Sequence, residues 1–500
     1  MSAKEVNKQI DLSESDDPFF FFHIPKTAGS TLVDILEDYF HHREICPAYY
    51  TYELNDFSFD ELSSFRLFRG HIDYHVLCRY LRKAPQTITF LRHPVDHAIS
   101  IFSHLKRKTD EEYLEQEIQA VRQMNLEKFI FQPDRIINLD YSNLQLRTLV
   151  ANSDLDLAML RSPSLLAAAD SSVPTDRDLL DYGKKLLADF FFVGVAERFE
   201  DGLLLLSYHF GLRPLEFIPF INVSHNKPAK DSIAPEVYEQ IAWKSSLDFE
   251  LYKFGQELFE SRFNSMTQDL LARYGTAEQQ QLYSDEGEGE TAPRELIYQW
   301  LEEHYHYRFT RRHQAVSSFD YNAEQPLNGR QWHKREKFFT FGIARWTGPG
   351  PVSSLDLPLA AESDLKISFE VVLSLHDENL DNLKLSVGDQ PVVLTRRVTP
   401  TGTRLYEGIL TQERLAEGRG LVRLSFQVGK LLRANELNPA SEDDRVMGVV
   451  IKWVKVEPHL PEFRITNSEA AEKPTVLSRV FQVSSRGIWK APRFFFIPRY

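Results

Sequence analysis

The chain has 500 residues, with 58 Lys and Arg against 72 Asp and Glu, and a formal net charge of −14 at pH 7. This length allows about two to four domains, and a hydrophobic content of 42% excludes wholesale disorder. The acidic balance argues against a general nucleic-acid binder, which would carry a basic excess. Only two cysteines occur, Cys46 and Cys78, which excludes a disulfide-built scaffold and argues against a cysteine-based zinc site.

The first 17 residues form a polar, acid-rich tail, unlike a signal peptide or a membrane anchor. No apolar run approaches the ~20 residues that a membrane-spanning helix needs. We therefore expect a cytoplasmic protein without a transmembrane segment.

From residue 18 to about residue 280, short apolar runs alternate with stretches of helical period. Residues 19–24 form one such run, followed by a Lys/Gly/Ser/Thr turn and by apolar residues at helical spacing. Residues 87–91 begin a second unit of this kind, and residues 190–195 are a third candidate for a buried strand. Strands that alternate with helices predict an α/β domain with a central parallel sheet over residues 18–280.

The rest of the chain divides into four segments. Residues 281–292 read as an acidic, glycine-rich linker and residues 293–330 as a helical connector rich in aromatic residues. Residues 331–460 contain many short runs with period-two alternation, broken by Gly, Asp and Pro, which predicts an all-β sandwich of jelly-roll type. Residues 461–500 form a basic, aromatic tail that either packs back on a domain or contacts a lipid surface or an acidic partner.

The strongest motif is His-Ile-Pro-Lys-Thr-Ala-Gly-Ser-Thr, residues 23–31, at the junction between a predicted strand and a predicted helix. Such a junction presents backbone N–H groups and the positive end of a helix dipole to an anion. Gly29 allows close backbone approach, hydroxyl side chains can donate to phosphate oxygens, and Lys26 adds a positive charge. The motif differs from a Walker A loop, in which the lysine directly follows the last glycine, because Lys26 precedes Gly29. A capped helix with an exposed lysine is the structural alternative.

The second motif is Thr-Phe-Leu-Arg-His-Pro, residues 89–94, at another strand-to-helix corner. Arg92 can form a bidentate pair with a phosphate, and Ser100 on the following helix can supply a hydroxyl group. The alternative is a structural arginine paired with a carboxylate such as Asp96. Ligands of open α/β sheets bind at the carboxyl ends of the strands, so two cationic corners suit a nucleotide with phosphates at both ends.

These two motifs resemble the sulfotransferases that use 3′-phosphoadenosine-5′-phosphosulfate (PAPS), and within them the carbohydrate family typified by heparan sulfate 2-O-sulfotransferase. The resemblance covers about residues 18–274 and implies a P-loop-like sulfotransferase domain. It implies that the first loop binds the 5′-phosphosulfate, through Pro25, Lys26, Thr27, Ala28, Gly29, Ser30 and Thr31. It also implies that Arg92 and Ser100 bind the 3′-phosphate.

Further segments extend the resemblance. Residues 68–74, Phe-Arg-Gly-His-Ile-Asp-Tyr, are similar to the family's Gly-His segment, which makes His71 the implied catalytic base and Lys26 its electrostatic partner. Residues 223–228 lie where the family has a loop that closes over the nucleotide, which implies contacts from Ser224, Asn226 and Lys227. This loop lacks the Arg-Lys pair of the family, and no counterpart of the family's acceptor-binding residues is present, so the acceptor sugar stays open.

The implied reaction is an O-sulfotransfer from PAPS to a hydroxyl group of a carbohydrate, by in-line displacement and without a metal ion. Lys26 would neutralise charge on the leaving oxygens, and a neutral His71 would accept the hydroxyl proton. Two alternatives remain: a nucleotide-dependent kinase, and a non-catalytic carbohydrate-binding scaffold.

Overall fold

The computed structural model describes residues 9, 17–107, 120–131, 141–151, 175–215, 233–283, 292–441 and 443–459. All of them belong to one compact unit, Met1–His459. The predicted tail of residues 461–500 lies outside the described residues.

The N-terminal region contains a four-stranded parallel sheet with the strand order β2-β1-β3-β4. Its strands are β1 (Phe19–Phe22), β2 (Leu67–Gly70), β3 (Gln86–Leu91) and β4 (Phe192–Val195). Nearly all of their side chains are buried, as expected where helices cover both faces of a parallel sheet. The prediction of an α/β domain with a parallel sheet is confirmed.

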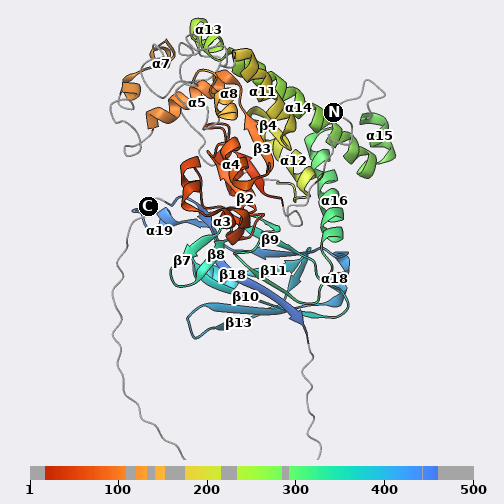
Figure 1. The fold of residues 1–500 in the computed structure, drawn as a ribbon. Helices are drawn as coiled ribbons and strands as arrows, with labels where there is room; N and C mark the ends of the chain where they lie inside the picture. The colour runs from red at the N-terminus through yellow and green to blue at the C-terminus, as the bar shows by residue number, and fades with distance from the viewer. Residues whose placement is uncertain are drawn as a thin grey trace, which may run out of the picture. The chain divides into compact units, whose positions relative to one another are not determined.

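Helices enclose this sheet (Figure 1). The longer ones are α2 (Gly29–Glu37), α4 (Tyr74–Leu81), α5 (Pro94–Arg107), α11 (Asp176–Asp189), α12 (Phe199–Phe210), α13 (Pro235–Lys244) and α14 (Ser246–Tyr274). Shorter ones are α3 (Phe59–Ser64), α7 (Leu126–Phe131), α8 (Leu144–Val150) and α15 (Ala277–Tyr283), with 3₁₀ turns η1 (His42–Glu44), η2 (Thr51–Asp56) and η3 (Ala196–Arg198). Both α12 and α14 pack on β4, because each presents apolar side chains to the sheet.

The C-terminal region consists of antiparallel sheets. One has the order β13-β14-β10-β18-β8-β7, with β5 also paired to β18, and the other has the order β12-β11-β15-β9-β6. Both contribute to a single apolar core, in which the rings of Phe369 on β10 and Phe426 on β15 lie 5.2 Å apart. Two antiparallel sheets that share one core form a sandwich, so the predicted β-rich region is present.

The strands of this region are β5 (Phe319–Asn322), β6 (Gly329–Arg330), β7 (Glu336–Phe338), β8 (Gly342–Trp346), β9 (Val352–Leu357), β10 (Leu365–Ser374), β11 (Lys384–Val387), β12 (Gln390–Val392), β13 (Leu394–Val398), β14 (Arg404–Leu410), β15 (Val422–Gln427), β16 (Leu432–Arg433), β17 (Val446–Met447) and β18 (Val449–Pro458). Three short helices accompany them: α17 (Glu378–Asn382), α18 (Gln412–Glu417) and α19 (Ala434–Leu437). Helix α16 (Arg294–Arg312) precedes the strands and occupies part of the predicted connector.

Arginine side chains of the C-terminal region contact the end of α2. Arg345 is almost fully buried, and its Nη1 lies 2.8 Å from Asp38 Oδ1. Arg335 donates from Nη2 to the carbonyl oxygens of Glu37 at 2.7 Å and Phe40 at 2.9 Å. These contacts hold the two regions together within the compact unit.

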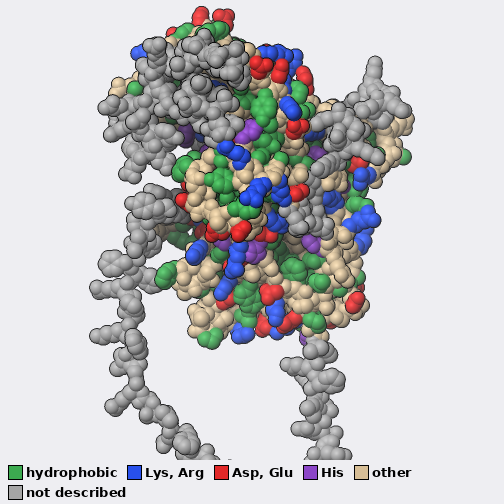
Figure 2. Space-filling model, viewed as in Figure 1, with side chains coloured by type: hydrophobic (Ala, Val, Ile, Leu, Met, Phe, Trp, Pro, Cys, Tyr) green, Lys and Arg blue, Asp and Glu red, His purple; other side chains and the backbone are tan. Residues whose placement is uncertain are grey.

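The surface carries charges of both signs, and on the face seen in Figure 2 Lys and Arg side chains are interspersed with Asp and Glu. None of the helices in the described part of the chain is long and apolar enough to cross a membrane.

Candidate functional site

The two motif loops follow β1 and β3, which are neighbours in the sheet. The chain passes from β1 outward to β2 and then crosses back to β3 on the other side of β1. The connection that leaves β1 thus runs to β2, whereas the connection that leaves β3 runs in the opposite direction to β4. Such a switch point leaves an opening between β1 and β3 at their carboxyl ends. The loops that contain Lys26 and Arg92 lie at this point.

The first loop is fixed by its carbonyl oxygens. Four consecutive carbonyls each accept a hydrogen bond from a side chain: His23 O from His71 Nδ1 at 2.9 Å, Ile24 O from Thr27 Oγ1 at 2.8 Å, Pro25 O from His97 Nε2 at 2.8 Å and Lys26 O from Arg92 Nη1 at 3.0 Å. A carbonyl oxygen can only accept, so the histidine nitrogens in these bonds carry protons. These side chains thus fix the backbone conformation of the first loop.

The backbone of this loop has the geometry of an anion site. Lys26 and Ala28 have φ values of 66° and 70°, in the left-handed region, and α2 begins directly after Ala28 without a side-chain cap. Left-handed residues alternating with ordinary ones turn successive N–H groups to one side, and the start of a helix adds its positive partial charge. The loop is therefore suited to bind an anion through backbone N–H groups.

Gly29 is required by a close approach. A Cβ atom at this position would lie 1.9 Å from Nε2 of His23, far inside van der Waals contact. The His23 ring is itself held by stacking on Phe21 and His71, with centroid distances of 5.4 Å and 4.5 Å. Only glycine lets the helix start pass this close to the ring.

The second loop is held by a buried amide. Gln145 on α8 accepts from the backbone N–H of Arg92 and donates to its carbonyl oxygen, both at 2.8 Å. Asp248 on α14 in turn accepts from the backbone N–H groups of Gln145 and Leu146, at 3.0 Å and 2.8 Å. Gln145 and Asp248 are both about 1% exposed, so two helices distant in the sequence position Arg92.

The guanidinium of Arg92 reaches toward the first loop. Burial lowers its pKa, although Glu197 and Asp96 oppose that effect. Its Nε atom is buried and has no hydrogen-bond partner in the structure as described, whereas Nη1 binds Lys26 O. An arginine that keeps an unpaired, buried nitrogen beside an anion-binding loop is a candidate ligand for a phosphate oxygen.

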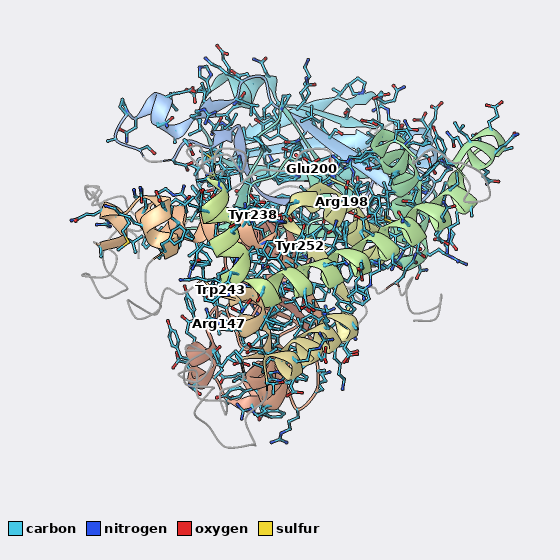
Figure 3. The ribbon with its side chains drawn as sticks, turned by 90° about the horizontal axis from the view of Figure 1, so that it is seen from above. Arg147, Arg198, Glu200, Tyr238, Trp243 and Tyr252 are labelled. Carbon is cyan, nitrogen blue, oxygen red and sulfur yellow. The ribbon has the colours of Figure 1, made fainter. Side chains whose placement is uncertain are left out.

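A third corner, after β4, borders the second loop. Glu197 accepts from the backbone N–H of His93 at 2.9 Å and from the Tyr252 hydroxyl at 3.0 Å. Figure 3 labels Tyr252 on α14 and Arg198, the residue after Glu197. Arg198 in turn lies 4.9 Å over the Phe259 ring of the same helix. Helix α14 thereby ties the β3 and β4 corners together.

His71 has a defined tautomer. Its Nδ1–H donates to His23 O, so Nε2 of the neutral ring carries a lone pair. Burial lowers the pKa of His71, the hydrogen bond to His23 opposes this, and the Lys26 ammonium lowers it further. The ring is therefore neutral near pH 7 with Nε2 able to accept a proton, as a general base requires.

Lys26 lies within electrostatic reach of three imidazoles. It contributes, after burial, to lowering the pKa of His23 to about 3 and that of His97 to about 4, and it also acts on His71. Because these three rings stay neutral, Lys26 supplies the positive charge of the first loop.

The remaining predicted residues occupy different places. Thr27 is fully buried, and its hydroxyl proton is committed to Ile24 O, so it closes the turn. Ser30 is exposed at the start of α2, whereas Thr31 is buried. Ser100 is buried on α5, the helix that begins just after Arg92. Ser224, Asn226 and Lys227 lie outside the described residues.

Three residues of the site were not predicted from the sequence. His23 and His97 support the first loop, and Gln145 supports the second. His23 is the first residue of the first motif and His97 stands three residues after the second motif, so position in the sequence is a usable signal for both. Gln145 lies 53 residues from Arg92, and no local pattern marks it. Among the described residues, no group of three or more His, Cys, Asp or Glu is arranged to hold a metal ion.

Comparison with known proteins adds little to this geometry. No protein-family model matches the sequence, and no curated protein matches it. One similar solved structure is a family GH115 4-O-methyl-alpha-glucuronidase with specificity for decorated arabinogalactans. It is 11% identical, the match covers 79% of this chain and 58% of that chain, and the TM-score is 0.18. A likeness this low carries no argument about fold or function.

Proposed function

We propose that this protein is an O-sulfotransferase that moves a sulfuryl group from PAPS to a hydroxyl group of a carbohydrate. The observation that carries the proposal is the convergence of two cationic corners at the β1/β3 switch point, where Arg92 Nη1 donates to Lys26 O. A donor with a phosphosulfate at one end and a phosphate at the other needs two such anion sites close together. This region of the chain is then a P-loop-like sulfotransferase domain.

The residues present fit that donor. The loop of residues 25–31 offers backbone N–H groups, a helix start and Lys26 for the 5′-phosphosulfate. Arg92, with a buried Nε atom that lacks a partner, and Ser100 are assigned to the 3′-phosphate. When bound, the donor supplies an activated sulfuryl group and a nucleotide leaving group.

Residues of the protein accept the proton of the acceptor hydroxyl and stabilise the charge that develops on the leaving group. His71 accepts the proton of the acceptor hydroxyl on Nε2, while its Nδ1–H bond to His23 O keeps the ring in place. Lys26 and the loop N–H groups stabilise the negative charge that develops on the leaving oxygens. The transfer resembles phosphoryl transfer, in which position and charge stabilisation dominate.

The acceptor class rests on the motif resemblance alone. The motifs resemble those of carbohydrate sulfotransferases, and we assign the β-sandwich a role in holding the acceptor or a partner. Peripheral contact of residues 461–500 with a membrane is a further proposal that the described residues do not address.

Two measurements test the proposal. Purified protein is incubated with sulfur-labelled PAPS and a panel of glycans, and label transfer to a glycan is expected. Separately, adenosine 3′,5′-bisphosphate is expected to raise the melting temperature, since a ligand selective for the folded state stabilises it. Arg92→Ala should remove this rise, whereas Arg43→Ala, on a surface arginine, should keep it.

The alternatives give different results. Phosphate transfer from ATP without sulfate transfer from PAPS would make the protein a kinase. Glycan binding that survives Lys26→Ala, with no transfer by the wild type, would make it a scaffold. Absence of any bisphosphate-dependent stabilisation would overturn the donor assignment itself.

A further inference from the structure

A separate cluster of charge lies away from the loops, where the C-terminal region contacts the helices α12 and α16. Arg330 on β6 pairs in the backbone with Ser354 on β9, and the Ser354 hydroxyl accepts from Arg213 Nη1 at 2.8 Å. Arg213 also lies 3.5 Å from Glu302 and 3.7 Å from Asp356. All these residues belong to one compact unit.

Arg330 is unusual within this cluster. Its Nε, Nη1 and Nη2 atoms are all buried and have no hydrogen-bond partner, and among the described arginines no other has three such nitrogens. No carboxylate lies within ion-pair distance of Arg330 in the described part of the chain. Leaving a buried charge without a partner is strongly unfavourable.

The carboxylates of this cluster, those of Asp356 and Glu302, pair with arginines other than Arg330. Asp356 makes two hydrogen bonds with Arg423, through Nε at 2.8 Å and Nη2 at 3.1 Å. Glu302 approaches both Arg213 and Arg423, each at 3.5 Å. Three guanidinium groups, those of Arg213, Arg330 and Arg423, therefore face two carboxylates, and one positive charge is left over.

Two other arginines of the C-terminal region, Arg345 and Arg335, differ from Arg330 because their guanidinium groups have partners. Arg345 is almost fully buried, and its Nη1 meets Asp38 at 2.8 Å. Arg335 places its guanidinium on three backbone carbonyl oxygens, those of Glu324, Glu37 and Phe40. Arg330 has neither kind of partner.

We propose that the guanidinium of Arg330, with Arg213 beside it, binds a small inorganic oxyanion of the sulfate or phosphate class. The planar fork of a guanidinium matches two oxygens of such an ion, and the excess positive charge of the cluster supplies the attraction. The ion would neutralise the contact between Arg330 on β6 and Arg213, which follows α12, and so strengthen the attachment of the β-sandwich. This site is independent of the donor site and of the proposed activity.

The test uses the full-length protein in sulfate and in chloride at equal ionic strength. Sulfate is expected to raise the melting temperature of the wild type by a few degrees at concentrations well above Kd. Combined with Lys26→Ala, which impairs the donor loop, Arg330→Met should abolish this rise; alone, in chloride, it should melt at or above the wild type, because the uncompensated charge is gone. Equilibrium dialysis of labelled sulfate against Lys26→Ala, which impairs the donor loop, should still show one bound ion that Arg330→Met removes.

Arg345→Met is the matched control, since this buried arginine already has an anionic partner. It should lower the melting temperature in both salts and keep the sulfate-dependent rise. If Arg330→Met does not fold, Arg330→Lys retains the charge but loses the fork, and weaker sulfate binding is expected.

Two results would overturn the proposal. One is a loss of stability in Arg330→Met that is equal in both salts, with sulfate binding unchanged, which would leave Arg330 a packing residue. The other is stabilisation by a sulfated disaccharide but not by inorganic sulfate, which would assign the site to sulfate groups carried by a polymer.

Discussion

Arg92 Nη1 and the carbonyl oxygen of Lys26 lie 3.0 Å apart and form a hydrogen bond between two loops that are 66 residues apart in the sequence. The bond links the two sides of the β1/β3 switch point, because Arg92 directly follows β3 and Lys26 lies in the loop that follows β1. It also means that neither loop is independent: the cation of one loop holds the backbone of the other. A ligand that engages both loops would meet a preorganised site, which reduces the cost of binding.

The close approach of Gly29 to His23 gives the first prediction. Gly29→Ala should destabilise the protein by about 1–3 kcal/mol, because the new Cβ would overlap a ring that cannot move away. It should also abolish stabilisation by adenosine 3′,5′-bisphosphate, since a displaced His23 disturbs the loop. Thermal unfolding with and without the bisphosphate measures both effects.

Gly429→Ala is the control for this substitution. The nearest atom to its added Cβ would be Asn382 Cβ at 3.5 Å, an ordinary contact. Normal stability and normal bisphosphate response in Gly29→Ala would show that the loop tolerates a side chain and is not built as described.

His71 gives the second prediction. His71→Ala should lower the rate of sulfate transfer at saturating PAPS by about 10²–10⁴-fold, the usual contribution of a general base. Saturation is needed because loss of the bond to His23 O should also weaken donor binding. Because burial and Lys26 lower the pKa of His71 below 6.5, the ring stays neutral in mildly acidic solution. The rate should therefore hold as the pH falls to 6.5 and decline only at lower pH.

The pH–rate profile of the wild type and single-turnover rates of the variants provide this measurement. His75→Ala is the matched control, on a histidine of α4 whose ring stacks on Tyr182. A full rate in His71→Ala, or a loss of rate beginning above pH 6.5, would exclude His71 as the base.

Gln145 gives the third prediction. Gln145→Leu leaves the buried backbone N–H and C=O groups of Arg92 without partners, so Arg92 should lose its fixed position. We expect the Kd for adenosine 3′,5′-bisphosphate to rise by about tenfold or more, since each of the two groups left without a partner costs about 1–3 kcal/mol and tenfold in Kd is about 1.4 kcal/mol. Isothermal titration gives the Kd.

A purely structural role of Gln145 would lower stability without this change in Kd. Thr148→Ala, on the same helix, removes a hydroxyl that bonds only to Leu144 O and should leave the Kd unchanged. An unaltered Kd in folded Gln145→Leu would mean that Arg92 either keeps its place without the amide or does not bind the nucleotide.

His97 gives the fourth prediction, on pH dependence. Burial, opposed by the bond to Pro25 O and reinforced by Arg92 and Lys26, lowers its pKa from 6.5 to about 4. Between these values the unfolded chain binds a proton at this ring that the folded chain does not. The free energy of unfolding therefore falls as the pH falls, by about 1.4 kcal/mol per pH unit from this group.

His97→Gln should remove that part of the slope, as measured by urea unfolding at about pH 7 and about pH 5. It should also weaken bisphosphate binding, because His97 holds Pro25 O. His304→Gln is the comparison: burial lowers the pKa of His304 to about 4 as well, so the slope should fall, but bisphosphate binding should not change. An unchanged slope in His97→Gln would show that the ring is protonated in the folded protein.

Part of this architecture could be predicted from local sequence. The apolar runs that became β1, β3 and β4 are continuous because both faces of a parallel strand are buried, and the structure confirms them with slightly different ends. The alternating runs of the C-terminal region likewise mark strands with one buried face. By contrast, β2 was not predicted as a strand, since Arg69 interrupts its apolar character.

The sequence by itself determined where the two cationic strand-to-helix corners lie, because Lys26 and Gly29 in the first motif and Arg92 in the second each follow an apolar run in the local sequence. Only the tertiary structure decided that β1 lies beside β3, so that the Lys26 and Arg92 loops meet. It also decided that His71 faces His23 and that Gln145 clamps Arg92, across 48 and 53 residues of sequence. Strand pairing and buried hydrogen bonds join distant residues through the packing of the whole chain, and no local spacing encodes them.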